Sequence, residues 1–167
     1  DTKNFTAEQM AVELQKLGST INIFSDLKGI SFNVQCLKKN LDKTLTLLEE
    51  RMLNPKFTED AFKRNQKQII ESFKQTKSQP AAVASEVIAK INYGPNSILA
   101  MSEDGTEYTV KNMKLSDIQN YYNNYMTSKD AKVVVVGDVK QEEALPKLTA
   151  LLNKLPNKKI VLPSVGA

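Results

Sequence analysis

The 167-residue sequence predicts an α+β fold, in which helices pack on one face of a small, mostly antiparallel sheet as a two-layer sandwich. Three observations predict it. Helical periodicity fills most of the chain, period-two alternation is confined to residues 20–37, and the run "VVVV" at residues 133–136 is apolar throughout. The expected order is α-β-β-α-α-α-α-β-α. Three strands are fewer than the roughly four to six of an ordinary sheet, so we expect further strands, before residue 1, in a longer protein.

The first helix and a hairpin are predicted from local signals. Thr6 and Gln9 have the spacing of a capping box, and Gly18 ends the helix. Residues 20–24 and 30–37 alternate as two strands with one buried apolar face, formed by Ile21, Ile23, Ile30, Phe32, Val34 and Cys36. Cys36 is therefore predicted to be a small buried hydrophobe, and as the one cysteine it excludes an internal disulfide.

The middle of the chain is predicted to be helical. Asn40 caps a helix that stops at Asn54-Pro55. Thr58 caps a longer helix, and Glu59 and Asp60 in its first turn suit the helix dipole. Pro80 interrupts this helix, and helical sequence continues to Gly94.

The C-terminal third is expected to contain the third strand. A short helical turn is predicted at residues 106–112, and Ser116 with Gln119 resembles a capping box that opens another helix. Val133–Val136 is predicted to be a strand buried on both faces. A last helix is expected over 142–155, where Pro146 is tolerable only near the first turn. We expect a single domain over residues 1–156 and a linker or tail over 157–167.

Composition excludes several classes of function. The net charge of +4 comes from scattered lysines, which favour a solvated surface over a nucleic-acid site. No apolar run approaches the roughly 18 residues of a membrane helix, so we expect a soluble protein. Its compartment stays open, with the bacterial periplasm and the cytoplasm as the two candidates. Histidine is absent, which removes Ser-His-Asp triads and histidine-ligated zinc.

Two candidate sites are interpreted as structural. On a helical projection Phe62, Ile69 and Phe73 define one apolar direction, and Glu71 lies about 180° from it. Glu71 is therefore predicted to be a solvated charge between Lys67 and Lys74. Asp138 directly follows Gly137 and would repel phosphate, so the glycine indicates a tight strand-to-helix turn and no nucleotide site.

Five sequence segments, taken in this order, resemble one protein family: "TAEQMAVELQKLGSTINIFSD", "CLKKNLDKTLTLLEERMLNPKFTEDAFKRNQKQII", "QPAAVASEVIAKINYG", "DGTEYTVKNMKLSDIQNYY" and "VVVVGDV". Together they are similar to the insulinase/pitrilysin family of zinc metallopeptidases, which includes the mitochondrial processing peptidases. The resemblance covers about residues 6–155. It implies the LuxS/MPP-like metallopeptidase fold, without its N-terminal strands and its zinc-motif helix.

The resemblance also implies where a zinc site would be. The family binds zinc through a His-x-x-Glu-His motif on an earlier helix and a third-ligand Glu on the helix that matches residues 58–77. Placing Arg64-Asn65 on the family's Arg-Glu pair puts the third ligand at Ser72, near Glu71. The resemblance therefore implies no catalytic residue and no metal ligand in this chain, and zinc only in the catalytic half of the parent protein.

The family's members are similar to clamshells with an active and an inactive half. The sequence of this chain resembles that of the inactive half. The resemblance implies that the chain helps to close the peptide chamber and holds extended peptide, beside a catalytic half that belongs to the same chain or to a partner chain. Two alternatives are an active-half domain truncated after its zinc motif and a purely structural scaffold; a basic binding module is a third. No nucleic-acid or membrane partner is expected. An unpaired sheet edge is expected to be covered by a second copy, as a homodimer, or by the tail around residues 159–162.

Overall fold

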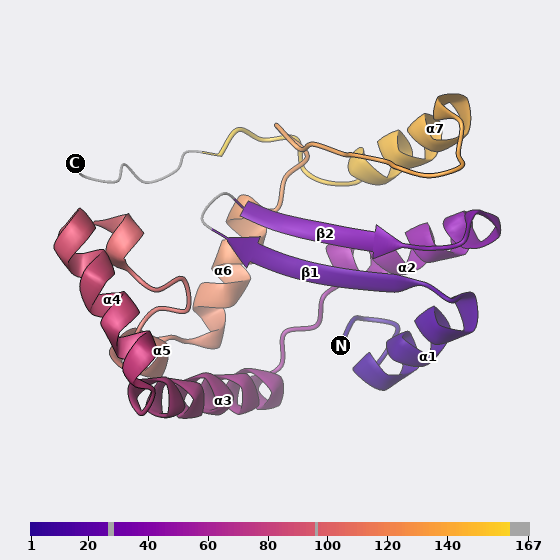
Figure 1. Cartoon of the computed structure of the whole chain (residues 1–167). Helices are drawn as coiled ribbons and strands as arrows, with labels where there is room; N and C mark the ends of the chain where they lie inside the picture. Colours follow the sequence, from indigo (N-terminus) through magenta and orange to yellow (C-terminus); the bar gives the residue numbers. More distant parts are fainter. Residues whose placement is uncertain (27–28, 96, 161–167) are drawn as a thin grey trace. The chain divides into compact units, whose positions relative to one another are not determined.

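The structure is a computed structural model that describes residues 1–26, 29–95 and 97–160. These residues form two compact units. The first unit consists of residues 1–56 and 121–160, and the second of residues 57–120. Figure 1 labels the α-helices and strands. With two short 3-10 helices, the elements in chain order are α1 (Ala7–Leu17), β1 (Thr20–Asp26), β2 (Gly29–Gln35), η1 (Lys38–Asn40), α2 (Leu41–Leu53), α3 (Glu59–Lys77), α4 (Pro80–Tyr93), η2 (Ile98–Ala100), α5 (Glu107–Asn112), α6 (Leu115–Tyr125) and α7 (Gln141–Leu152).

Most helix boundaries follow the predicted capping signals. The Thr6 hydroxyl accepts from the Gln9 amide at 3.2 Å, and the Gln9 side chain accepts from the Thr6 amide at 2.9 Å. Thr58 accepts from the Ala61 amide at 3.3 Å. Gly18 ends α1 with a φ of 59°, a left-handed conformation that glycine adopts without strain. The α+β class, with helices and a small antiparallel sheet, is therefore confirmed.

Three of the predicted helix details are wrong. The Asn40 side chain donates to the Leu17 carbonyl at 2.8 Å, so it ties α2 to α1 and does not cap α2. Ser116 opens no helix, because α6 begins at Leu115 and the Asp117 carboxylate accepts from the Lys114 amide at 2.8 Å. Pro146 lies inside α7, where its ring nitrogen cannot donate to the turn before it.

The hairpin of β1 and β2 supplies one wall of the core of the first unit. Its antiparallel register pairs Ile21 with Val34 and Ile23 with Phe32. Ile21 is buried, whereas Ile23 is 46% exposed, so the predicted apolar face is buried only at one end. Cys36 is half-buried, not fully buried as predicted. The core cluster consists of Met10, Leu14, Ile21, Leu47, Leu48, Met52, Met126, Leu151 and Leu155.

The predicted third strand does not form in the part of the chain that the structure describes, where the sheet has only β1 and β2. Val134 and Val136 are 86% and 92% exposed instead of buried. A strand needs a hydrogen-bonding neighbour, and none of the described residues supplies one to this run. Residues 133–136 therefore have the composition of a strand but form no strand in the described part of the chain.

The predicted tail covers no strand within the described residues. The Lys158 amide donates to the Thr127 hydroxyl at 3.2 Å, which fixes the start of the tail beyond the end of α6. Residues 161 and 162, the last part of the predicted cover, lie outside the described residues. The homodimer remains a prediction.

The second unit has a thin core. Among its described residues, only Ala100 and Val110 are buried, and α3 and α4 contain no buried residue. The Gln66 side chain donates to the Val110 carbonyl at 2.7 Å, which joins α3 to α5. The half-buried positions of α3 include Phe62 and Phe73, whereas Ile69 is 39% exposed, so the predicted apolar stripe is shifted slightly around the helix.

Candidate functional site

The candidate site lies on α3, where the resemblance places the third zinc ligand. Thr58 caps this helix, and the acidic residues of its first turn and the lysines of its last turn suit the helix dipole. Glu71 is 55% exposed, and its carboxylate lies 4.0 Å from the Lys67 ammonium. The helical phase predicted from the sequence is therefore correct for Glu71, which is a solvated charge on the helix surface.

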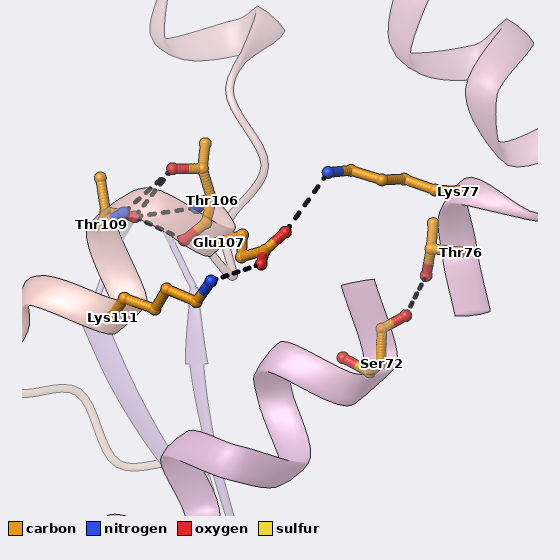
Figure 2. Close-up of polar contacts among 7 residues, drawn as sticks. All are labelled: Ser72, Thr76, Lys77, Thr106, Glu107, Thr109 and Lys111. Carbon is orange, nitrogen blue, oxygen red and sulfur yellow. Dashed lines mark hydrogen bonds and ion pairs between the residues drawn. The ribbon is translucent and has the colours of Figure 1, made fainter. Parts of the chain in front are cut away.

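Ser72 is exposed, and its hydroxyl donates to the Ile69 carbonyl of the same helix at 2.7 Å. Its own carbonyl accepts from the Thr76 hydroxyl at 3.0 Å, as Figure 2 shows. Both contacts are local helix contacts, and neither brings a second element to Ser72. Arg64 and Asn65, which set the register of this position, are also exposed.

The charged contacts near the end of α3 join it to α5. Glu107 lies between Lys77, at 3.5 Å, and Lys111, at 2.7 Å (Figure 2). The hydrogen bond from Lys111, with the charges of Lys111 and Lys77, lowers the pKa of the Glu107 carboxyl. The Thr106 and Thr109 side chains form the capping box of α5, which fixes Glu107 in its first turn. This cluster holds two helices together and carries one carboxylate between two ammonium groups.

These residues do not fit a zinc ion. Zinc sites in proteins take three or four nitrogen, sulfur or carboxylate ligands. Among the described residues, no three Asp, Glu or Cys side chains lie close enough together to hold a metal ion. The hydroxyl of Ser72 is a poor zinc ligand and is occupied by its own helix. No step of metal chemistry can be derived from these side chains.

The second unit also has an open recess of about 450 Å³ at the other end of α3. Phe62, Met113 and Leu115 give it an apolar floor, and Glu59, Ser116 and Gln119 add polar groups. Lys114 also lines the recess, which therefore contains one carboxylate and one ammonium group but no second acid, and it offers mainly a surface for contact.

The tyrosines of α6 are divided between packing and surface. The rings of Tyr121 and Tyr125 stack with centroids 4.8 Å apart. The Tyr122 hydroxyl donates to the Met52 carbonyl at 2.6 Å, and burial raises the pKa of its phenol. Tyr122 therefore ties α6 to α2, whereas Tyr121 is 47% exposed.

Sequence reasoning missed the one buried carboxylate of the described residues. Glu50 is 7% exposed and accepts from the Asn4 amide at 2.9 Å, the Asn4 side chain at 3.0 Å and the Asn54 side chain at 2.9 Å. Burial raises the pKa of this carboxyl, but hydrogen bonds from Asn4, Thr2 and Asn54 outweigh burial and lower it. Glu50 is a structural anchor between the N-terminal segment and α2.

No described helix combines the length and the apolar character needed to cross a bilayer. The helices and the antiparallel hairpin define an α+β fold. A family model described as Insulinase (Peptidase family M16) matches residues 1–111. A second model, described as the Peptidase M16 inactive domain, matches residues 112–166. The chain therefore belongs to the insulinase family of peptidases, as the sequence resemblance predicted.

Individual relatives agree with this assignment. The chain is 26% identical to the non-peptidase homolog YmxG of Helicobacter pylori, over 95% of this chain and 36% of that protein. It is 23% identical to a probable mitochondrial-processing peptidase subunit beta of Arabidopsis thaliana, over 92% of this chain and 29% of that protein. The crystal structure of a peptidase M16 inactive domain from Pseudomonas fluorescens has a TM-score of 0.86 with 19% identity, over 98% of this chain and 40% of that one. The chain thus spans about a third of the length of the curated relatives.

Replacing Glu71 by alanine is expected to change the free energy of unfolding by no more than about 0.5 kcal/mol. The side chain is exposed, and an exposed ion pair such as Lys67–Glu71 contributes little. A urea titration followed by circular dichroism measures this. The matched control is Phe73→Ala on the same helix, whose half-buried ring should cost about 1–2 kcal/mol, less than a fully buried ring. Equal losses for the two variants would mean that the phase of α3 is wrong.

Proposed function

We propose that this chain belongs to the non-catalytic half of an insulinase-family zinc peptidase, where it helps to close the peptide chamber and to hold extended peptide. Because the chain spans only about a third of its curated relatives, activity and substrate are properties of the longer protein. Extended peptide is the substrate class we propose. The partner is a catalytic half, in the same or in a second chain, which would bring the zinc ion.

The observation that carries the proposal is the state of the implied ligand position. Ser72 turns its hydroxyl back onto α3, and the nearest carboxylate, Glu71, is on the solvated face beside Lys67. A zinc peptidase needs a ligand there that can reach a metal ion together with other ligands. The match of residues 112–166 to the inactive-domain model supports the same assignment.

Two other readings of the family membership predict different results. An active half that lies after a His-x-x-Glu-His motif would need Ser72 or Glu71 for zinc. A structural scaffold would have no peptidase activity in the longer protein, and the relative called a non-peptidase homolog favours this reading.

The test has two parts. First, the 167-residue chain is dialysed against micromolar zinc and its metal content is measured by mass spectrometry. We expect no stoichiometric zinc, because the described residues offer no ligand set. Stoichiometric zinc that is lost in Ser72→Ala or Glu71→Ala would support the active half and contradict the proposal.

Second, cleavage of fluorescein-labelled casein by the longer protein is measured with and without a chelator. We expect chelator-sensitive cleavage that Ser72→Ala leaves unchanged. Loss of cleavage in Ser72→Ala, with the fold retained, would support the active half. Complete absence of cleavage in the wild-type longer protein, across unfolded substrates, would support the scaffold.

A further inference from the structure

The loop before α5, in the second unit, contains the one Asp-Gly pair of the sequence, Asp104-Gly105. Asp104 is exposed, and no hydrogen bond or ion pair of its carboxylate is found among the described residues. The carboxyl carbon of an aspartate and the backbone nitrogen of the next residue can close a five-membered ring. Glycine has no Cβ to obstruct this approach, so Asp104 has the most accessible backbone nitrogen beside it.

We propose that Asp104 is a site of spontaneous backbone modification, at which the folded chain converts to isoaspartate. The nitrogen of Gly105 attacks Cγ of Asp104, the N–Cγ bond forms, and one carboxyl oxygen leaves as water with the amide proton and one proton from solvent. Water then breaks the bond between this nitrogen and the former backbone carbonyl carbon, which becomes a free carboxylate. The main chain now runs through Cγ and is one methylene longer, and the net reaction is an isomerisation.

A single turn of the backbone controls this reaction. The Gly105 amide donates to the Ser102 carbonyl at 3.0 Å, and the Asp104 amide donates to the Ser102 hydroxyl at 3.3 Å. The ring closes only after the Gly105 bond opens, because the attacking nitrogen must lose its proton. The turn lies in an exposed loop, so it opens without the unfolding of a helix.

The modification loosens the junction between α5 and α3. Gly105 has a φ of 77°, and a Cβ there would lie 2.8 Å from the Thr109 hydroxyl oxygen, so the chain is closely fitted at this point. An added methylene displaces Thr106, whose hydroxyl accepts from the Thr109 amide and caps α5 (Figure 2). The capped helix holds the Val110 carbonyl in place for the Gln66 side chain of α3. Loss of the cap therefore weakens a contact on which the thin core of the second unit depends.

Asp130 provides a matched control in the same chain. It is also exposed, and the amide of the next residue, Ala131, donates to the Ser128 carbonyl at 3.2 Å. This is the turn contact that Gly105 makes with Ser102, but the residue after the aspartate is alanine. The Cβ of Ala131 obstructs the approach of the carboxyl group, so we expect roughly tenfold less isoaspartate at Asp130 than at Asp104.

Peptide mapping of the folded 167-residue chain, incubated at neutral pH for several weeks, measures both sites. We expect isoaspartate to accumulate at Asp104. Asp104→Glu should give none at this position, because the longer side chain would have to close a six-membered ring. Asp104→Asn should react faster, because ammonia leaves the side-chain amide more readily than water leaves the carboxyl group. Equal amounts at Asp104 and Asp130, or accumulation at Asp104 only in denaturant, would overturn the proposal.

Hydrogen exchange tests the structural consequence separately. Converted and unconverted chains are separated by chromatography and compared at the Val110 amide, which donates to the Thr106 carbonyl at 2.9 Å within α5. We expect this amide to exchange at least about threefold faster in the converted chain, and the amides of α1 and α2 to be unchanged. Unchanged exchange at Val110 in the converted chain would overturn the loosening of α5.

Discussion

Replacing Glu50 by alanine is expected to destabilise the first unit by about 1–3 kcal/mol, because it removes the charged acceptor of three partly buried hydrogen bonds. The carboxylate accepts from the Asn4 amide and from the side chains of Asn4 and Asn54. The same corner of the unit contains the bridge between Thr2 and Pro55 and the bond from the Lys3 amide to the Asn54 carbonyl. Loss of the carboxylate therefore loosens the N-terminal segment as well as the end of α2.

The matched control is the neighbouring Glu49→Ala. The Glu49 side chain is 32% exposed and pairs with Lys154 at 2.7 Å at the surface of the same unit. Such a pair contributes about 0–1 kcal/mol. Urea titrations of both variants at neutral pH provide the comparison, and equal losses would contradict the anchoring role of Glu50.

The pH dependence of stability provides a second measure of the same anchor. The hydrogen bonds to Glu50 outweigh burial and lower its pKa in the folded state. The folded chain therefore prefers the ionised carboxylate, and the stabilisation is complete above the unfolded pKa of about 4.3 and is lost as the pH falls through the folded pKa. Glu50→Gln cannot ionise, so the difference in stability between wild type and Glu50→Gln should shrink below about pH 4. A difference that stays constant down to pH 2 would contradict this linkage.

The sequence predicts well those features that depend on neighbouring residues. Thr6, Thr58 and Gly18 act within a few residues of their own positions, and the structure has each of them in its predicted role. Pro80 is the first residue of α4, which is also a local effect. The first backbone amides of a helix have no partner within the helix, so a proline that lacks this amide is tolerated there. The outward placement of Glu71 follows from helical phase alone.

Features that depend on distant partners were mispredicted or missed. Asn40 has the residue type of a cap, but the Leu17 carbonyl from another element takes its side chain. The partners of Glu50 come from the N-terminus and from Asn54, so no spacing around Glu50 reveals the site. Val134 and Val136 have the composition of a buried strand, but burial of a strand depends on neighbours that the described residues do not contain.

Ser72 shows a further limit of sequence reasoning. Ser72 was assigned to the third-ligand position by placing Arg64-Asn65 on the family's Arg-Glu pair. The helix geometry alone would not single out this residue. The structure adds that its hydroxyl is bonded within its own helix. The zinc measurement proposed above tests whether Ser72 is also unable to bind a metal ion.

Replacing Leu48 by alanine is expected to destabilise the first unit by about 3–5 kcal/mol, in the upper part of the range for buried leucines. Leu48 is 6% exposed and lies on α2 in the core cluster, with Met10 of α1, Ile21 of β1 and Leu151 of α7 in the same cluster. The loss depends on how far the surroundings can collapse into the cavity. Here collapse is restricted, because α2 is fixed on both sides of Leu48.

The fixed points of α2 are Thr44 and Glu50. The Thr44 side chain is fully buried, with its hydroxyl 2.8 Å from the Ser19 hydroxyl and 2.9 Å from the Asn40 carbonyl, and Glu50 holds the N-terminal segment. A shift of α2 toward the cavity would stretch both sets of hydrogen bonds, so the cavity should stay largely open. Leu37→Ala, at a 53% exposed leucine of the same unit, is the control and should cost less than about 1 kcal/mol. A loss below about 2 kcal/mol in the urea titration of Leu48→Ala would show that α2 moves to fill the cavity and that these hydrogen bonds do not hold it in place.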